Sequence, residues 1–222
     1  MAVSKAHPAG AVADAYAAGL RLFGENRVQE FQQKSLQLGP LGHASLPGAQ
    51  FNLIGPLQSN KSAKAVELFD SIDTVDSLKL AQRLDSAAGH LGKALPLLLE
   101  IKLSDEPSKH GLLPGSPELA ALLEALPGLT RLHPRGLMTV PPFSEDPEAA
   151  RPYFRELREL RDRLATQHPR LDFAELSMGM SHDFTVAIEE GSTCIRIGTA
   201  LFGARSLAMR APWPNQSSPG TE

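Results

Sequence analysis

The sequence predicts a single α/β domain folded as a (β/α)8 barrel. Eight short apolar segments alternate with helix-like segments along most of the 222 residues. Several apolar segments are continuous rather than alternating, which is typical of parallel strands covered on both faces. Polar, glycine-containing stretches follow these segments, where the active sites of barrels are built. A doubly wound open sheet is the main alternative.

The eight predicted strands are short and lie all along the chain. They cover residues 2–4, 21–24, 51–54, 71–75, 95–101, 136–140, 174–177 and 193–197. Helix start signals lie between them: Ser116 and Asp146 each precede a proline, and Asp76 or Ser77 opens a further helix. We expect residues 1–205 to form the barrel. The tail 206–222, rich in proline, serine and glycine, is expected to be disordered.

Composition limits the classes of function. The chain is 42% hydrophobic, enough for one sizeable core, and its net charge of −3 does not favour nucleic acid or acidic lipid. The lone Cys194 excludes an intramolecular disulfide, and the histidines lack the spacing of metal ligands. No apolar run approaches the roughly 20 residues of a membrane span, and no signal peptide is recognisable. We therefore expect a cytoplasmic protein without a metal site.

Lys5 is the first candidate for chemistry. It follows the strand-like segment Ala2-Val3-Ser4 and precedes a predicted helix. A lysine at the carboxyl end of a barrel strand is well placed to form a Schiff base with an aldehyde, once burial or nearby positive charge lowers its pKa. The alternative is a solvated surface lysine, and its position alone does not decide between the two.

Further candidates follow the last two predicted strands. Ser181 is expected at the N-cap of a helix, where its hydroxyl and the free N–H groups of the first turn could receive a phosphate. Arg196 interrupts a strand that otherwise reads as buried, so it needs a carboxylate or a ligand as partner. Gly198 and Thr199 come next, in a loop that often binds phosphate in barrels. A plain helix cap and a structural ion pair are the alternatives.

Polar groups also follow strands two and three, in Phe23-Gly24-Glu25-Asn26 and in the stretch from Ile54 to Lys61. Both stretches would lie at the same barrel rim, or would serve only as turns and helix caps. There is no P-loop, nucleophile elbow or dinucleotide-binding glycine motif.

In their order along the chain, these segments resemble a known family from Ala2 to about Arg205. The segments are Ala2-Val3-Ser4-Lys5, Phe23-Gly24-Glu25-Asn26, Gln58-Ser59-Asn60-Lys61, Val75-Asp76-Ser77, Ser108-Lys109-His110-Gly111, Gly136-Leu137-Met138, Ser177 to Ser181 and Arg196 to Thr199. Each segment is a weak signal alone. The ordered set is similar to the pyridoxal phosphate homeostasis protein family.

The resemblance implies a single-domain barrel like the N-terminal domain of alanine racemase. It also implies pyridoxal 5′-phosphate held by Lys5 as an internal aldimine. Ser181, Gly198 and Thr199 are expected around the phosphate, Arg196 at the pyridine nitrogen and Asn26 in the same cofactor site. The family binds the cofactor and maintains its supply without an established catalytic reaction. Apo-enzymes that need the cofactor are the expected partners, and the protein is expected to be a monomer.

The residues fit that role. An arginine beside the pyridine nitrogen disfavours its protonation and makes the ring a weaker electron sink, so carbanion chemistry would be poorly supported. Reversible imine exchange needs only the lysine, an aldehyde and an accessible site. Two alternatives stay open. One is a pyridoxal-phosphate-dependent racemase or lyase acting on amino acids, and the other is a Schiff-base aldolase or another phosphate-binding barrel enzyme.

The start of the chain departs from the family pattern. Members usually carry a helix and the beginning of strand one before the lysine, whereas four residues precede Lys5 here. We therefore expect a shortened first strand, no N-terminal helix and a less rigidly held Lys5. Asn52 and Pro56 stand where many members have histidine.

Overall fold

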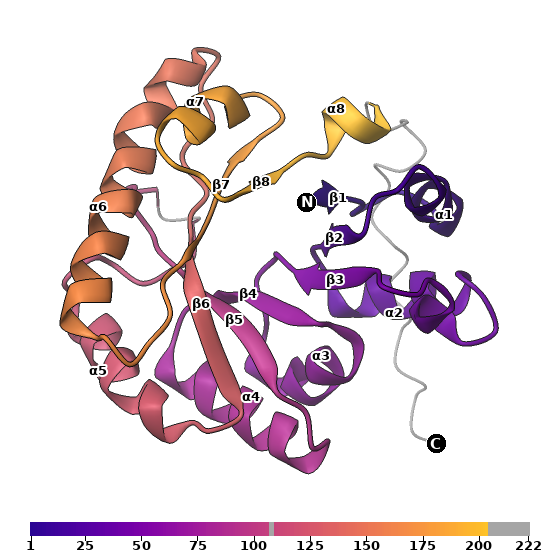
Figure 1. Ribbon diagram of the computed structural model, residues 1–222, viewed down its shortest axis with the longest axis horizontal. Coiled ribbons are helices and arrows are strands. Elements are labelled where there is room, and N and C mark those ends of the chain that lie inside the picture. Colours follow the sequence, from indigo (N-terminus) through magenta and orange to yellow (C-terminus); the bar gives the residue numbers. More distant parts are fainter. Residues whose placement is uncertain (107–108, 204–222) are drawn as a thin grey trace, which may run out of the picture.

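The computed structural model describes residues 1–106 and 109–203, and in this part of the chain eight strands form one parallel sheet. Spatial order follows chain order, and each strand pairs in parallel with the next. Ala2 of the first strand also pairs with Ile197, directly after the last strand. The ends of the sheet therefore meet, which confirms the predicted (β/α)8 barrel and excludes the open sheet. Figure 1 shows the helices around the outside of the strands.

The elements alternate as expected for this fold. The strands are β1 (Ala2–Val3), β2 (Leu22–Glu25), β3 (Gln50–Leu53), β4 (Ser71–Val75), β5 (Leu95–Glu100), β6 (Leu132–Met138), β7 (Glu175–Met180) and β8 (Cys194–Arg196). The α-helices are α1 (Ala9–Ala17), α2 (Val28–Leu36), α3 (Ser62–Leu68), α4 (Leu78–His90), α5 (Pro117–Ala125), α6 (Arg151–Gln167), α7 (Phe184–Glu189) and α8 (Thr199–Phe202). Short 3-10 turns are η1 (Gly42–Ser45), η2 (Ser59–Lys61), η3 (Leu126–Gly128) and η4 (Pro147–Ala150).

Two strands differ from their predicted bounds by more than one residue at an end. β6 begins at Leu132, ahead of the predicted residue 136, because β5 pairs with it from Leu95 onward and so overrides the loop-like composition of residues 133–135. β7 continues to Met180 rather than ending at 177, which moves the start of the next helix toward the C-terminus. The first strand has two residues, so its expected shortness is confirmed.

The predicted helix start signals function as caps. The Ser116 hydroxyl accepts a hydrogen bond from Leu119 N at 3.2 Å, and the Ser77 hydroxyl accepts one from Leu80 N at 3.3 Å. Asp146 accepts from Glu148 N at 3.0 Å and begins η4, which leads directly into α6. These bonds satisfy N–H groups that the first turn of a helix leaves without partners.

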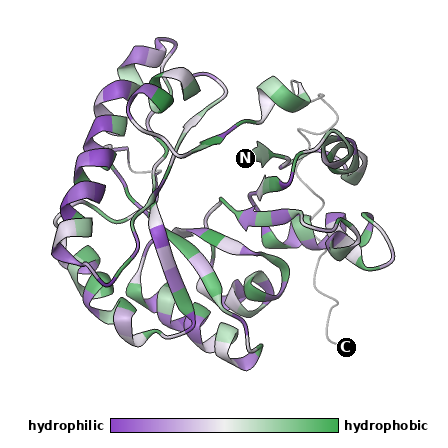
Figure 2. Ribbon diagram, viewed as in Figure 1, coloured by the Kyte–Doolittle hydropathy of each residue, from purple (hydrophilic) through white to green (hydrophobic). Residues whose placement is uncertain are grey.

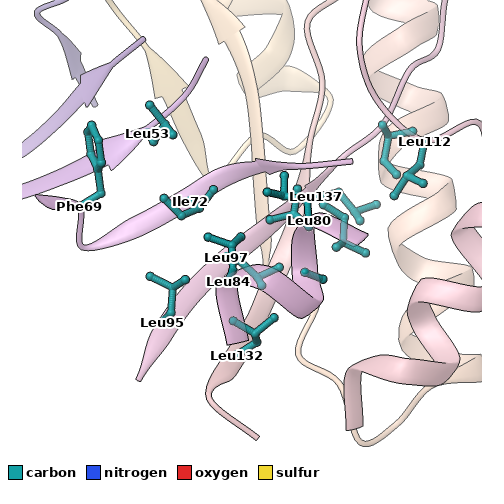
Figure 3. Close-up of a cluster of buried hydrophobic side chains, with 14 of the residues drawn as sticks. Leu53, Phe69, Ile72, Leu80, Leu84, Leu95, Leu97, Leu112, Leu132 and Leu137 are labelled. Atoms are coloured by element: carbon teal, nitrogen blue, oxygen red, sulfur yellow. The ribbon is translucent and has the colours of Figure 1, made fainter. Parts of the chain in front are cut away.

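The main apolar core lies between the strands and the surrounding helices. Its centre includes Phe23, Phe31 and Phe51, all fully buried, with the Phe31 and Phe51 rings 4.7 Å apart. Figure 3 shows the neighbouring part of this core, where leucines of β5, β6 and α4 point toward one another. Figure 2 shows that α6, on the outside of the barrel, carries many hydrophilic residues. Burial of one face therefore fixes each helix against the sheet.

The interior of the barrel is more polar than this outer core. On β5, Leu97 and Leu99 belong to the apolar core on the helix side, so the alternating Leu98 and Glu100 face the interior. Asp73 of β4 and Arg196 of β8 are also buried. Branched apolar side chains dominate the interiors of most barrels of this kind. Buried polar groups here therefore point to a functional region.

Two further expectations from the sequence concern the C-terminal tail and membrane-spanning helices. The tail predicted to be disordered, 206–222, lies outside the described residues. No helix within residues 1–106 and 109–203 is both long and apolar enough to cross a membrane.

Gly55 lets the loop after β3 pack closely against the loop after β2, and its replacement tests this contact. A Cβ there would overlap the backbone carbonyl oxygen of Asn26, whereas a Cβ on Gly10 in α1 would meet nothing within 4 Å. We expect Gly55→Ala to lower the free energy of unfolding by about 1–3 kcal/mol, because backbone must move. Gly10→Ala should raise it by about 0.5–1 kcal/mol. Denaturant unfolding measures both, and equal effects would contradict the close approach.

Candidate functional site

Lys5 lies on a tight turn directly after β1. Ser4 N donates to Gly24 O at 3.1 Å, so the pairing with β2 continues one residue past the strand, and His7 N then donates back to Ser4 O at 3.0 Å. Ser4 is fully buried and its hydroxyl donates to Glu25 Oε1 at 2.7 Å, on the helix side of the barrel. Because side chains of an extended chain alternate, we infer that partly buried Lys5 lies on the interior side.

Arg196 is held inside the barrel by two strands. Its Nη1 donates to Ser177 Oγ at 2.8 Å and its Nη2 donates to Thr139 O at 2.7 Å. Burial lowers the pKa of the guanidinium, while nearby acidic groups raise it. Among the described residues, no carboxylate forms an ion pair with it. Neutral groups, rather than a structural ion pair, therefore hold Arg196 in place.

Ser181 connects the ends of β7 and β8. Its hydroxyl oxygen accepts from Gly198 N at 3.2 Å and from Ala200 N at 3.4 Å. The expectation that Ser181 caps the helix after β7 is wrong. α7 begins at Phe184, and Asp183 occupies the N-cap position, because β7 extends three residues further than predicted.

The strand-one and strand-eight sides of the site lie next to each other. Val3 N donates to Ile197 O at 2.8 Å, and a Cβ built on Gly198 would lie 3.4 Å from Val3 O. Lys5, two residues beyond Val3, is therefore near Gly198 along the rim. Thr199 follows at the start of α8 and is exposed.

Asn26 lies at the same rim, directly after β2. It is partly buried, and its backbone carbonyl oxygen lies so close to Gly55 that a Cβ on that residue would overlap it. The close approach fixes the backbone of the loop after β2 against the loop after β3. The rim thus presents Lys5, Asn26, Ser181 and Gly198 from four different strand ends.

Two buried carboxyl groups of the interior were not among the sequence candidates. Asp73 accepts hydrogen bonds from Ser71 Oγ at 2.7 Å and from Asn52 Nδ2 at 3.1 Å, and burial raises its pKa to about 6. Glu100 Oε2 is buried and has no hydrogen-bond partner among the described residues. The signal was present in the sequence, since each acid interrupts an apolar strand. Asn52, a departure from the family pattern, is one of the groups that hold Asp73.

Glu100 is the buried carboxyl group that titrates near neutrality. Its pKa is raised to about 7, mainly by burial and also by Asp76, while Arg196 and Lys109 oppose the increase. The ordinary value for this carboxyl is 4.5. Between these two pH values the unfolded chain loses the proton more readily, so the native state becomes less stable as the pH rises.

A Glu100→Gln substitution should remove this pH-dependent cost. The two free energies of unfolding should lie closest together near pH 4.5. By pH 8 the free energy of unfolding of the variant should have risen by about 1–3 kcal/mol relative to that of the wild type. Urea unfolding of both proteins across this range, without added ligand, measures the difference. A difference that is constant with pH would show that Glu100 does not titrate as the structure indicates.

By its sequence, this barrel belongs to the class of the alanine racemase barrels. The sequence model described as "Alanine racemase, N-terminal domain" matches residues 1–206. An alanine racemase from Clostridium difficile has the same fold, with a TM-score of 0.69 over 91% of this chain and 51% of that chain, at 15% identity. At this identity the likeness shows the fold alone.

Other relatives are much more similar. The protein named "Pyridoxal phosphate homeostasis protein" from Vibrio alginolyticus is 44% identical over 209 residues, covering 94% of this chain and 87% of its own. The protein of that name from Escherichia coli K12 is 43% identical, with coverage of 95% and 87%. The chain therefore belongs to the alanine racemase N-terminal domain family and, within it, to the pyridoxal phosphate homeostasis proteins.

A solved structure supports the same placement. PipY of Synechococcus elongatus, solved with pyridoxal phosphate bound, is 45% identical to this chain and covers 91% of each chain, with a TM-score of 0.83. PipY solved without the cofactor has a TM-score of 0.81 at 46% identity.

Proposed function

We propose that this chain binds pyridoxal 5′-phosphate through Lys5 and maintains its supply, rather than using it in catalytic turnover. The observation that carries the proposal is the meeting of β1 and β8, which brings the Lys5 turn close to Gly198 and Ser181. The names of the relatives and the cofactor bound by PipY support it. Cytoplasmic location, a monomeric state and delivery to apo-enzymes belong to the same proposal.

The groups at the rim fit the chemistry of this cofactor. Lys5 supplies a primary amine for the aldehyde, and Arg196 supplies a buried cation for the pyridine nitrogen. The hydroxyls of Ser181 and Thr199 and the N–H of Gly198 are donors of the kind that bind phosphate. Asn26 adds an amide at the same rim. None of these groups is a carboxylate, so none of them would repel the anionic phosphate.

When bound, the cofactor supplies an aldehyde that condenses reversibly with amines. The Lys5 amine would form a C=N bond to the aldehyde carbon with loss of one water, and the reverse reaction with water would release the aldehyde. Arg196 carries its own protons and therefore disfavours a proton on the pyridine nitrogen. This weakens the ring as an electron sink, which favours storage and release over turnover.

Trapping the bond tests the proposal. Borohydride treatment of the protein loaded with the cofactor should attach a reduced pyridoxyl group to Lys5, and Lys5→Arg should abolish the adduct. Arginine keeps the positive charge but does not form the bond, so the variant should still fold. Peptide mass spectrometry locates the adduct. Cofactor bound by a protein whose Lys5 stays unmodified would overturn the assignment.

One observation favours a second candidate function, a racemase or lyase acting on amino acids. Glu100, with a pKa of about 7, could exchange a proton at neutral pH. That function predicts exchange of the substrate α-proton in deuterated water, lost in Glu100→Gln. We expect no exchange over a panel of amino acids, because Arg196 weakens the electron sink. Nuclear magnetic resonance of the amino acids measures it, and exchange that depends on Glu100 would instead establish an enzyme.

A further inference from the structure

The turn that carries Lys5 has an unfavourable backbone conformation. Ala6, directly after the lysine, has a φ of 61°, the one left-handed value outside glycine among the described residues. This is the third position of the turn from Ser4 to His7, where glycine or asparagine is usually found. An alanine is less stable than a glycine in this conformation, because its Cβ is crowded by the backbone. Other interactions must therefore hold the turn in place.

Helix α2 supplies two such interactions, one on each side of Lys5. Lys34 Nζ donates to Ser4 O at 2.8 Å, and Ala6 N donates to Glu30 Oε1 at 2.6 Å. Glu30 and Lys34 lie one helical turn apart on α2, and their charged groups are 3.8 Å apart. We call these two residues the α2 clamp. It binds the backbone of both neighbours of Lys5.

A buried carboxylate orients the lysine of the clamp. Glu25, fully buried on β2, lies 2.6 Å from Lys34 Nζ and also accepts the Ser4 hydroxyl at 2.7 Å. Lys34 itself is 6% exposed. Burying such a pair often gives no more stability than packed apolar groups would, whereas it does fix geometry. A role in positioning therefore explains these charges better than a role in stability.

We propose that the α2 clamp positions Lys5 for bond formation with the cofactor aldehyde. β1 contributes two residues, and the turn follows immediately. The clamp connects that turn to α2, which is anchored in the outer core by Val28 and Phe31. The inference rests on the proposed function and names the residues that prepare its amine.

The variants separate positioning from folding. Glu30→Ala removes the acceptor of Ala6 N, and Glu30→Gln keeps an oxygen there and should restore it. Glu25→Gln combined with Lys34→Met removes the other arm without leaving a buried charge unpaired. Lys93→Met is the matched control. Lys93 lies just before β5, and its Nζ also donates to backbone carbonyls, to Val66 O at 2.9 Å and to Phe69 O at 2.5 Å.

The first readout does not involve the cofactor. Amide hydrogen exchange of the ligand-free protein should be faster at Ala6 in Glu30→Ala and in the double variant, by roughly tenfold or more. It should be unchanged in Lys93→Met and close to wild type in Glu30→Gln. Unchanged exchange at Ala6 in the clamp variants would overturn the clamp, whatever the protein binds.

The second readout compares two ligands. Pyridoxine 5′-phosphate has an alcohol in place of the aldehyde, so it tests the phosphate and ring contacts without the bond to Lys5. The clamp variants should bind it as wild type does, yet form the borohydride-trapped Lys5 adduct with pyridoxal 5′-phosphate roughly tenfold more slowly. Equal adduct rates, or an equal loss for both ligands, would overturn the positioning role alone. A wild type that forms no adduct at Lys5 would overturn the proposed function and this inference with it.

Discussion

The two residues of β1 hydrogen-bond on both sides, and the barrel depends on these bonds. Val3 N donates to Ile197 O at 2.8 Å, Ile197 N donates to Met1 O at 3.0 Å, and the Met1 amino group donates to Ile195 O at 2.9 Å. On the other side Ala2 and Val3 pair with β2. A sheet closed in this way has no free edge. The same few bonds also set Val3, two residues before Lys5, beside Gly198.

The second constraint is the cost of a polar interior. Burial is the main cause that raises the pKa of Asp73 to about 6 and that of Glu100 to about 7, and it lowers the pKa of Arg196. Hydrogen bonds from Ser71 and Asn52 offset the cost for Asp73. Such groups would give a more stable barrel if apolar side chains replaced them. Their presence is consistent with an interior organised around a charged ligand.

Much of the fold was predictable, because the hydrophobic pattern is local. All eight strands overlap the segments predicted for them, and the caps at Ser77 and Ser116 act as their positions indicate. The errors arose where tertiary pairing overrides local composition. β6 begins inside a stretch containing Pro134 and Arg135, and β7 extends through Gly179 to Met180.

The site was predictable only in part. Arg196 stands out because its charge interrupts an apolar strand, whereas the position of Lys5 alone does not separate it from a surface lysine. The roles proposed for both came from the family resemblance. The partner of Ser181 was not predictable, since its hydroxyl accepts from Gly198 N, 17 positions away in the chain. Glu25, Glu30 and Lys34 lie on a helix and strand whose polar residues look solvated. Only the structure shows that they turn toward Ser4 and Ala6.

The closure between β1 and β8 has a consequence for how the protein is assembled. The hydrogen bonds from α2 and β2 to the Lys5 turn join residues separated by about one tenth to one seventh of the chain length, such as Ser4 and Lys34 at a separation of 30. The Met1–Ile195 bond, by contrast, spans 194 positions. During synthesis the lysine turn can form long before its counterpart at Ser181 and Gly198 exists. The two halves of the rim meet only when the last strand arrives. A ligand that contacts both halves of the rim would stabilise the closed barrel over one in which the last strand is not yet paired. Ligand binding and closure of the barrel would therefore favour each other.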